Sequence, residues 1–209
     1  MKRLLILHLF GALNAAVAYT TTDFYLAASA TNQFAVDLHR QVATGNDNLC
    51  VSPYSIQNAL AMAFAGAAGE TQTEMARALH FPGQTDGVLA SFAALQRSIE
   101  EVTTKTAEIA KNSKQFGGPS EPVTLTVANR LFAQSGHDFR QPFLALVKQN
   151  FSAAFEPTDF IHHASEATQH INNWVANQTH DRIRNLIPPG SLNDTTRIVL
   201  TNAIYLKAP

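Results

Sequence analysis

The sequence predicts an α+β fold, in which a run of helices is followed by strands that are separated by further helices. Three observations support this class. Apolar residues recur at helical spacing through most of residues 27–102. Residues 123–127 alternate valine or leucine with threonine, which is the period of a strand. Residues 198–206 are apolar at both parities, as expected of a strand that is covered on both faces.

Two helices are expected first. The spacing of Phe34, Leu38 and Val42 predicts a helix that begins near Ala27 and ends near Val42. A second helix should begin at Ser52-Pro53, an N-cap residue followed by proline at the first helical position. We expect this helix to be buried on nearly all sides, because its apolar positions cover most of its circumference; they are Ile56, Ala59, Leu60, Ala61, Met62, Ala63, Phe64 and Ala67.

Two more helices precede the first strand. Thr71 and Glu74 fit a capping box, in which each side chain satisfies a backbone donor at the start of the helix. A longer amphipathic helix is predicted where apolar residues between Val88 and Val102 alternate steps of four and three, and it should end in the polar stretch that begins at Asn112. Residues 112–122 are polar and contain glycine and proline, which predicts a surface loop.

The later elements follow from the same patterns. They are a strand from Val123 that continues through Asn129-Arg130-Leu131-Phe132, a helix over Pro142–Phe151, a short strand near Ala154, a helix over His163–Thr179, a turn at Pro188-Pro189-Gly190 and the strand Ile198–Leu206. Every one of these elements carries an apolar face that needs the others, so we expect a single domain without internal repeats.

The first 18 residues predict a secretory signal peptide. Basic residues at positions 2 and 3 precede an apolar run over residues 4–10, and small residues follow at positions 16–18. A membrane anchor is the alternative, but the run is too short to span a bilayer. We therefore expect residues 19–209 to form the mature chain and to be secreted into the extracellular space, or into the periplasm of a bacterium.

Composition argues against several partners. The chain has 15 Lys and Arg and 16 Asp and Glu residues, and without Lys2 and Arg3 its formal charge is −3. Nucleic acid is therefore not an expected partner, since phosphate binding favours a basic surface. No later stretch is apolar enough to predict contact with a membrane. Cys50 is the only cysteine, so no intramolecular disulfide is possible.

Charged residues near the end of the fourth predicted helix are a candidate polyanion site. Three lysines could form a basic edge there, but three glutamates lie between them, so we expect a solvated face; the six residues are Glu100, Glu101, Lys105, Glu108, Lys111 and Lys114.

No common catalytic motif occurs in the sequence. The nucleophile elbow, the P-loop and the HExxH motif are all absent, so we expect no enzyme activity and no cofactor. One group of residues resembles a metal site, namely His162, His163, Glu166 and His170. We interpret this group as the polar outer face of a helix, and no metal site is expected. Three asparagines match the N-x-S/T pattern and are candidate glycosylation sites, namely Asn150, Asn177 and Asn193.

Asn202 is the most informative polar residue in the predicted strands. It shares a strand face with Leu200 and Ile204, in a strand that is predicted to be buried. A buried carboxamide without partners costs about 1 to 3 kcal/mol, so we expect Asn202 to have hydrogen-bond partners. The alternative is that the strand is less buried than its composition suggests.

Five motifs resemble those of one family and occur in the same order. They are Ser52-Pro53-Tyr54-Ser55-Ile56, Gly66-Ala67-Ala68-Gly69-Glu70-Thr71, Asn129-Arg130-Leu131-Phe132, Ile171-Asn172-Asn173-Trp174-Val175 and Asn202-Ala203-Ile204-Tyr205-Leu206-Lys207. The sequence thus resembles the serpins. Leu206 departs from the family pattern, which usually has phenylalanine at this position.

The resemblance implies a fold in which a helical bundle packs on a large mixed β-sheet. Residues 19–209 would be a partial serpin domain that ends after a central sheet strand, without the carboxyl-terminal half and its reactive loop. It also implies that Ser52, Ser55 and Asn202 belong to the shutter, a region that controls opening of the sheet, where a histidine from later in the family's chain usually completes the cluster. Asn202's strand would then be a sheet edge.

The resemblance further implies a function. Serpins inhibit serine proteases, and in some cases cysteine proteases, by cleavage of the reactive loop and its insertion into the sheet. The 209 residues alone are expected to be inactive, because the loop would lie outside them. The alternative is a non-inhibitory serpin that acts as a binding, storage or chaperone protein, and an unrelated secreted enzyme is a third possibility.

Overall fold

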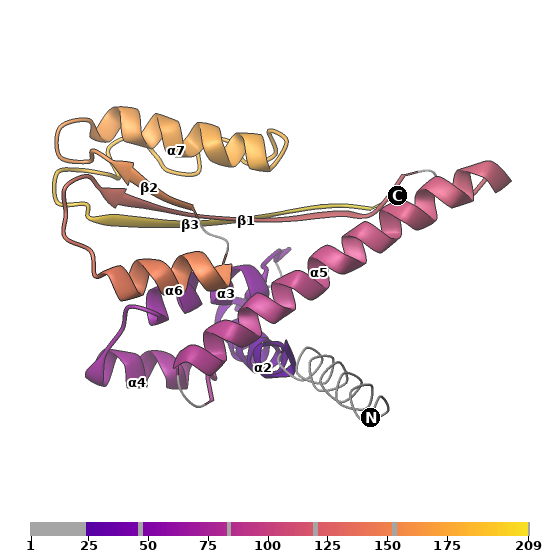
Figure 1. Cartoon of the computed structure of the whole chain (residues 1–209), viewed down its shortest axis with the longest axis horizontal. Helices are drawn as coiled ribbons and strands as arrows, with labels where there is room; N and C mark the ends of the chain where they lie inside the picture. Colours follow the sequence, from indigo (N-terminus) through magenta and orange to yellow (C-terminus); the bar gives the residue numbers. More distant parts are fainter. Residues whose placement is uncertain (1–23, 46–47, 83–84, 119–120, 152–153, 209) are drawn as a thin grey trace, which may run out of the picture.

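The computed structural model describes residues 24–45, 48–82, 85–118, 121–151 and 154–208. The predicted signal peptide, residues 1–18, lies outside the described residues. Figure 1 shows a sheet with a group of helices on one face and a single helix, α7, on the other. The predicted α+β class is confirmed. Among the described residues, no helix has the length and apolar character needed to cross a membrane.

The elements follow the predicted order. The helices are α2 (Phe24–Val42), α3 (Pro53–Phe64), α4 (Gly69–Ala78), α5 (Thr85–Ser113), the 3₁₀ turn η1 (Lys114–Phe116), α6 (Gln141–Phe151) and α7 (Ala164–Gln178). The strands are β1 (Thr124–Gln134), β2 (Ala154–Thr158) and β3 (Ile198–Lys207). Boundaries of the elements at residues 123–132, 142–151 and 163–179 agree with the sequence patterns to within two residues.

The sheet has the strand order β2-β1-β3. β1 pairs in parallel with β2 and antiparallel with β3, and Asn129 lies directly opposite Asn202. β2 is short and contains Pro157, which suits an edge because proline has no N–H to donate. β3 forms the other edge, and in the described part of the chain no strand pairs with its outer side. Figure 1 shows β1 and β3 continuing together as a long ribbon past α6 and α7, toward the far part of α5.

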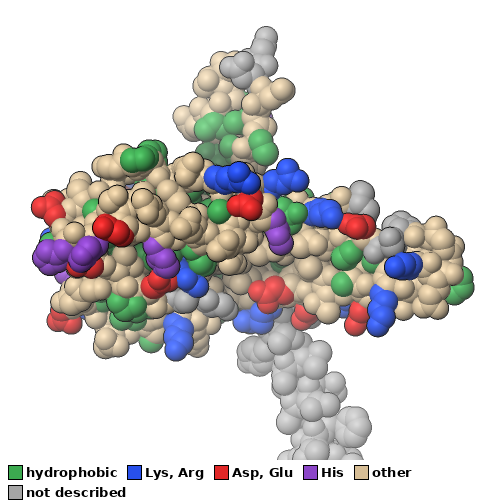
Figure 2. Space-filling model, turned by 90° about the horizontal axis from the view of Figure 1, so that it is seen from above, with side chains coloured by type: hydrophobic (Ala, Val, Ile, Leu, Met, Phe, Trp, Pro, Cys, Tyr) green, Lys and Arg blue, Asp and Glu red, His purple; other side chains and the backbone are tan. Residues whose placement is uncertain are grey.

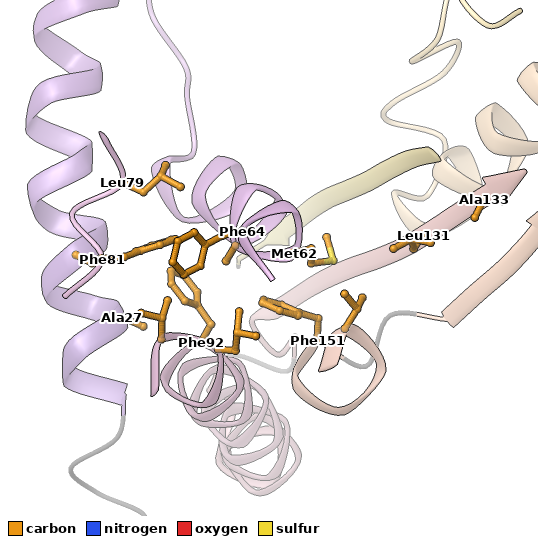
Figure 3. Close-up of a cluster of buried hydrophobic side chains, with 14 residues drawn as sticks. Ala27, Met62, Phe64, Leu79, Phe81, Phe92, Leu131, Ala133 and Phe151 are labelled. Carbon is orange, nitrogen blue, oxygen red and sulfur yellow. The ribbon is translucent and has the colours of Figure 1, made fainter. Parts of the chain in front are cut away.

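The main core lies between the helices and the sheet. Phe64, Phe81 and Phe92 are almost completely buried there, with ring centroids 5.2 and 5.6 Å apart in edge-to-face pairs. Figure 3 shows these rings beside Ala27 of α2, with Phe151 of α6 closer to β1. The aromatic group therefore joins α2, α3 and α5 into the layer on which the sheet rests.

A second, smaller core lies on the other face of the sheet. Phe132 and Phe160 are fully buried beneath Ala167 and Ile171 of α7. Successive side chains of a strand point to opposite faces, so Leu131 joins the main core while Phe132 joins the second one. α7 is thus held over the sheet by a few apolar side chains around Phe132.

The predicted burial of α3 is wrong in part. Ile56 and Leu60 are 36% and 37% exposed, although the sequence pattern placed them on a buried face. Gln57 and Asn58 are instead completely buried. Gln57 can be buried because its side chain accepts from the Thr31 hydroxyl at 2.5 Å and donates to the Leu79 carbonyl at 2.6 Å. Hydrogen bonds to protein groups allow a polar side chain to be buried in the core. Hydrophobic periodicity cannot predict such bonds, because it counts only apolar residues.

Two further burial predictions are corrected. β3 was expected to be covered on both faces, but only Thr201 and Ala203 are buried and Leu206 is 63% exposed. The reason is that the β1–β3 ribbon extends past α6 and α7, which cover only its other end. Val102 was expected on the apolar face of α5 and is 57% exposed, because that part of α5 also projects beyond the main core.

Of the two predicted helix starts, one is confirmed. Ser52 caps α3, and its side chain accepts from the Ser55 N–H at 3.3 Å. The capping box at Thr71 and Glu74 is wrong, since α4 begins at Gly69 and has Ala68 as an N-cap without a side-chain hydrogen bond. Gly69 has a φ of +60°, which glycine adopts at little cost, and this starts the helix before the threonine is reached.

Candidate functional site

Three side chains from three elements form a hydrogen-bonded chain between α3 and the sheet. The Ser55 hydroxyl donates to Oδ1 of Asn202. Nδ2 of Asn202 donates in turn to Oδ1 of Asn129 at 2.6 Å. Asn202 therefore has the partners that its position in an apolar strand requires. We call this group the Ser55–Asn202–Asn129 cluster.

Local structure explains how the cluster is positioned. Ser52 and Pro53 set the first turn of α3, and the bond from the Ser55 N–H to Ser52 holds Ser55 in that turn. The antiparallel register of β1 and β3 places Asn129 and Asn202 opposite each other. Their side chains share a sheet face, because directly opposed residues point the same way. The cluster thus ties one helix to two strands.

The three residues that the sequence predicted as the shutter, Ser52, Ser55 and Asn202, do not all belong to the cluster. Ser55 and Asn202 contact each other directly, whereas the Ser52 side chain accepts from the backbone N–H of Ser55. Ser55 and Asn202 are both half-buried, so β3 is indeed less buried than its composition suggests. Asn129 was not predicted as a partner. It lies 73 residues from Asn202, and only strand register brings the two together.

Two apolar grooves are lined in part by β3, and one of them lies beside the cluster. One, of about 380 Å³, is lined by Ser55, Ile56 and Leu60 of α3 and by Val199 and Asn202 of β3. The other, of about 520 Å³, lies between Gly66, Phe143 of α6 and the start of β3. The apolar stripe of α3 that the sequence predicted to be buried therefore lines the grooves. Aliphatic walls next to an unpaired strand edge can receive an extended segment.

The histidines near α7 do not form one site. Nδ1 of His162 and of His163 lie 3.0 and 3.1 Å from Oδ2 of Asp159, whereas His170 pairs with Glu156. Glu156 also accepts from Arg130 at 2.7 Å. Figure 2 shows some histidine side chains at one end of the displayed face and others nearer its middle. Across residues 24–208, apart from the short undescribed gaps, no three His, Cys, Asp or Glu side chains are arranged as metal ligands.

Asp159 provides a pH-dependent contribution to stability. Its Oδ1 accepts from the backbone N–H of His162 and of Ile161, both at 3.1 Å. The backbone bond from His162, followed by the side-chain bonds, holds the pKa of Asp159 well below its ordinary value. A lowered folded-state pKa stabilises the fold above the unfolded-state pKa of about 4, and this stabilisation is lost as the pH falls below it.

We expect Asp159→Asn to flatten the acid part of the stability profile. Urea midpoints measured from pH 6 down to pH 2 should fall less steeply in the variant, because asparagine can accept these bonds without titrating. Asp138→Asn, which changes an exposed aspartate in the segment between β1 and α6, serves as the control. An unchanged slope for Asp159→Asn would show that the hydrogen bonds to this carboxylate do not stabilise its charged form.

The remaining predicted surface residues lie in distinct settings. Asn150 is half-buried, and its Nδ2 donates to the Leu146 carbonyl at 2.9 Å. Asn177 is exposed near the end of α7. Asn193 is exposed in a turn, and its Oδ1 accepts from the Thr195 hydroxyl at 2.6 Å. Glycosylation of all three stays a prediction. The lysines and glutamates considered as a polyanion site are all exposed, namely Glu100, Glu101, Lys105, Glu108, Lys111 and Lys114.

The fold and the cluster together define a class. Helices back one face of a mixed sheet, α7 covers the other face, and a serine at the start of α3 bonds an asparagine of the edge strand. The family model described as "Serpin (serine protease inhibitor)" matches residues 29–209. The chain belongs to the serpin family, and the expected serpin fold is confirmed.

Similar proteins come from distant organisms. Bovine leukocyte elastase inhibitor is 36% identical over 182 residues, which is 86% of this chain and 43% of the relative. An uncharacterised serpin-like protein of Thermococcus kodakarensis is 36% identical over 180 residues, or 86% of this chain and 38% of the relative. Emu ovalbumin superposes with a TM-score of 0.68 at 28% identity, over 86% of this chain and 46% of ovalbumin. The chain therefore spans less than half the length of these relatives.

Proposed function

We propose that this protein acts as a serpin-type inhibitor of serine proteases, in which β3 borders the site that receives a cleaved reactive loop. The observation that carries the proposal is the free edge of β3. Its outer side pairs with no strand in the described structure, and an apolar groove and the Ser55–Asn202–Asn129 cluster lie beside it. A segment added there would gain main-chain hydrogen bonds and apolar contacts.

The comparisons support this proposal. The family is one of serine protease inhibitors, and one relative is named for inhibition of leukocyte elastase. The cluster offers hydroxyl and amide groups, which can exchange hydrogen-bond partners when strands separate. We infer a structural role in sheet opening for Ser52, Ser55 and Asn202, and secretion directed by residues 1–18.

Inhibition would require more than these 209 residues. The chain spans 43% of bovine leukocyte elastase inhibitor, and the trapping reaction needs a loop that can be cleaved and then inserted. We therefore expect the 209-residue chain to form no covalent complex. A longer gene product, with the length of these relatives, would be needed to provide the loop.

The test is a search for complexes that survive denaturing gel electrophoresis. The 209-residue chain and the longer gene product are each incubated with trypsin, chymotrypsin and leukocyte elastase, with bovine leukocyte elastase inhibitor as the positive control. A complex with the longer product alone supports the proposal. A complex with the 209-residue chain would contradict the need for a longer chain. Cleavage of a folded longer product without any complex would favour the binding, storage or chaperone alternative.

A further inference from the structure

Asn58 presents a polar group in the main core without a protein partner. The residue is completely buried near the middle of α3. Within the described part of the chain, neither Nδ2 nor Oδ1 has a hydrogen-bond partner. Its neighbour Gln57 is equally buried but bonds Thr31 and Leu79. A buried carboxamide without partners is strongly disfavoured, so the surroundings of Asn58 must supply them.

Other buried polar atoms without a protein partner lie on the elements around Asn58. In the described structure, three such atoms have no hydrogen-bond partner, namely the Tyr54 hydroxyl, Oε1 of Gln96 and Nδ2 of Asn129. They belong to α3, α5 and β1, and α5 contacts both of the other elements. Arg130 also has such an atom, Nε, but its guanidinium lies over the Trp174 ring on the α7 side of the sheet.

Two partly polar routes, one toward α5 and one toward the sheet, begin within one helical turn of Asn58 on α3. Tyr54 lies one helical turn before Asn58, and burial, followed by the charge of Glu100, raises the pKa of Tyr54 to about 12. Glu100 in turn accepts from Gln96 at 3.1 Å. On the other side, Ser55 lies three residues before Asn58 and leads through Asn202 to Asn129. Asn58 therefore lies on the side of α3 between α5 and the sheet.

We propose that Asn58, together with Tyr54, Gln96 and Asn129, binds ordered water where α3, α5 and β1 meet. Water donates two hydrogen bonds and accepts two. The amide groups of Asn58 and Asn129 are donors, Oδ1 of Asn58 and Oε1 of Gln96 are acceptors, and the Tyr54 hydroxyl is both. Buried waters usually bind about three polar groups of this kind. The water would extend the Ser55–Asn202–Asn129 cluster into the core and connect it to α5.

The direct test uses the unaltered 209-residue chain. Nuclear magnetic resonance should show cross-relaxation between the Asn58 side-chain amide protons and water, with the sign of a long-lived complex. A crystal structure should show water density about 2.7 to 3.2 Å from Nδ2 or Oδ1 of Asn58. Absence of both signals would overturn the proposal.

A substitution tests the energetic role of the site. Leucine has nearly the shape of asparagine but no polar atoms, so the sign of its effect distinguishes a hydrated amide from an unpaired one. If water binds here, Asn58→Leu should lower the folding equilibrium constant at least tenfold, since Asn129 and Tyr54 lose their shared partner. Asn173→Leu, at an exposed asparagine of α7, should change it less than threefold. A higher folding constant for Asn58→Leu would contradict the proposal.

A double-mutant cycle separates shared water from independent effects. Asn58→Leu and Asn129→Ala should be non-additive by at least threefold in the folding constant, because either change removes a ligand of the same water. Additive effects would show that the two residues bind no common water. If Asn58→Leu does not fold, the measurements on the unaltered chain decide the question.

Discussion

Replacing Phe132 with alanine should loosen α7 from the sheet and lower the free energy of unfolding by about 3 to 5 kcal/mol. Phe132 is completely buried at the centre of the second core, and its ring centroid lies 5.9 Å from that of Trp174 on α7. Removal of the ring leaves a cavity under a helix that has few other apolar contacts with the sheet. α7 should therefore lose order before the main core does.

The measurement can follow α7 specifically. Trp174 is the only tryptophan, so its fluorescence reports on this helix, while far-ultraviolet circular dichroism reports on the whole fold. In Phe132→Ala the fluorescence transition in urea should precede the circular dichroism transition. Phe155→Ala is the matched control, because Phe155 lies on β2 and is 40% exposed. Equal losses of stability in the two variants would refute the central role of Phe132.

Asn202→Ala should lower the free energy of unfolding by about 2 to 4 kcal/mol. The substitution removes two hydrogen bonds at once and leaves the Ser55 hydroxyl and Oδ1 of Asn129 without their partner. An unpaired buried polar group costs more than the bond itself contributes, because it has also lost its contact with water. The link between α3 and the edge strand would then consist of apolar packing alone.

Urea unfolding of the monomeric fraction measures this effect. Asn173→Ala, at an exposed asparagine of α7, should cost less than about 0.5 kcal/mol. A cycle with Ser55→Ala should show coupling of about 1 kcal/mol, because the two side chains bond directly. The cluster would have no stabilising role if Asn202→Ala cost no more than the control.

Short-range patterns predicted most of the elements. β1, α6 and α7 lie where residues 123–132, 142–151 and 163–179 predicted them. These predictions succeed because the helical and strand periods are properties of consecutive residues. The N-cap at Ser52 is equally local, since its bond to Ser55 spans three residues.

The predictions of side-chain burial in α3 failed because burial depends on contacts between distant elements. Sequence periodicity could not show that Gln57 and Asn58, rather than Ile56 and Leu60, face the core. That choice depends on where α2, α5 and β3 lie around α3. The capping box at Thr71 failed for a different reason, because a glycine two residues earlier could already start the helix.

In the candidate site too, neighbouring residues predicted some features, and contacts between distant elements decided the others. The sequence alone determined the class of fold, the order of elements, the family and the need of Asn202 for partners. Only the tertiary structure decided that one partner is Asn129, because strand register joins residues that are 73 positions apart. It also decided that the apolar stripe of α3 lines grooves beside β3. Side-chain burial depends on which elements meet, and local periodicity carries no information about that.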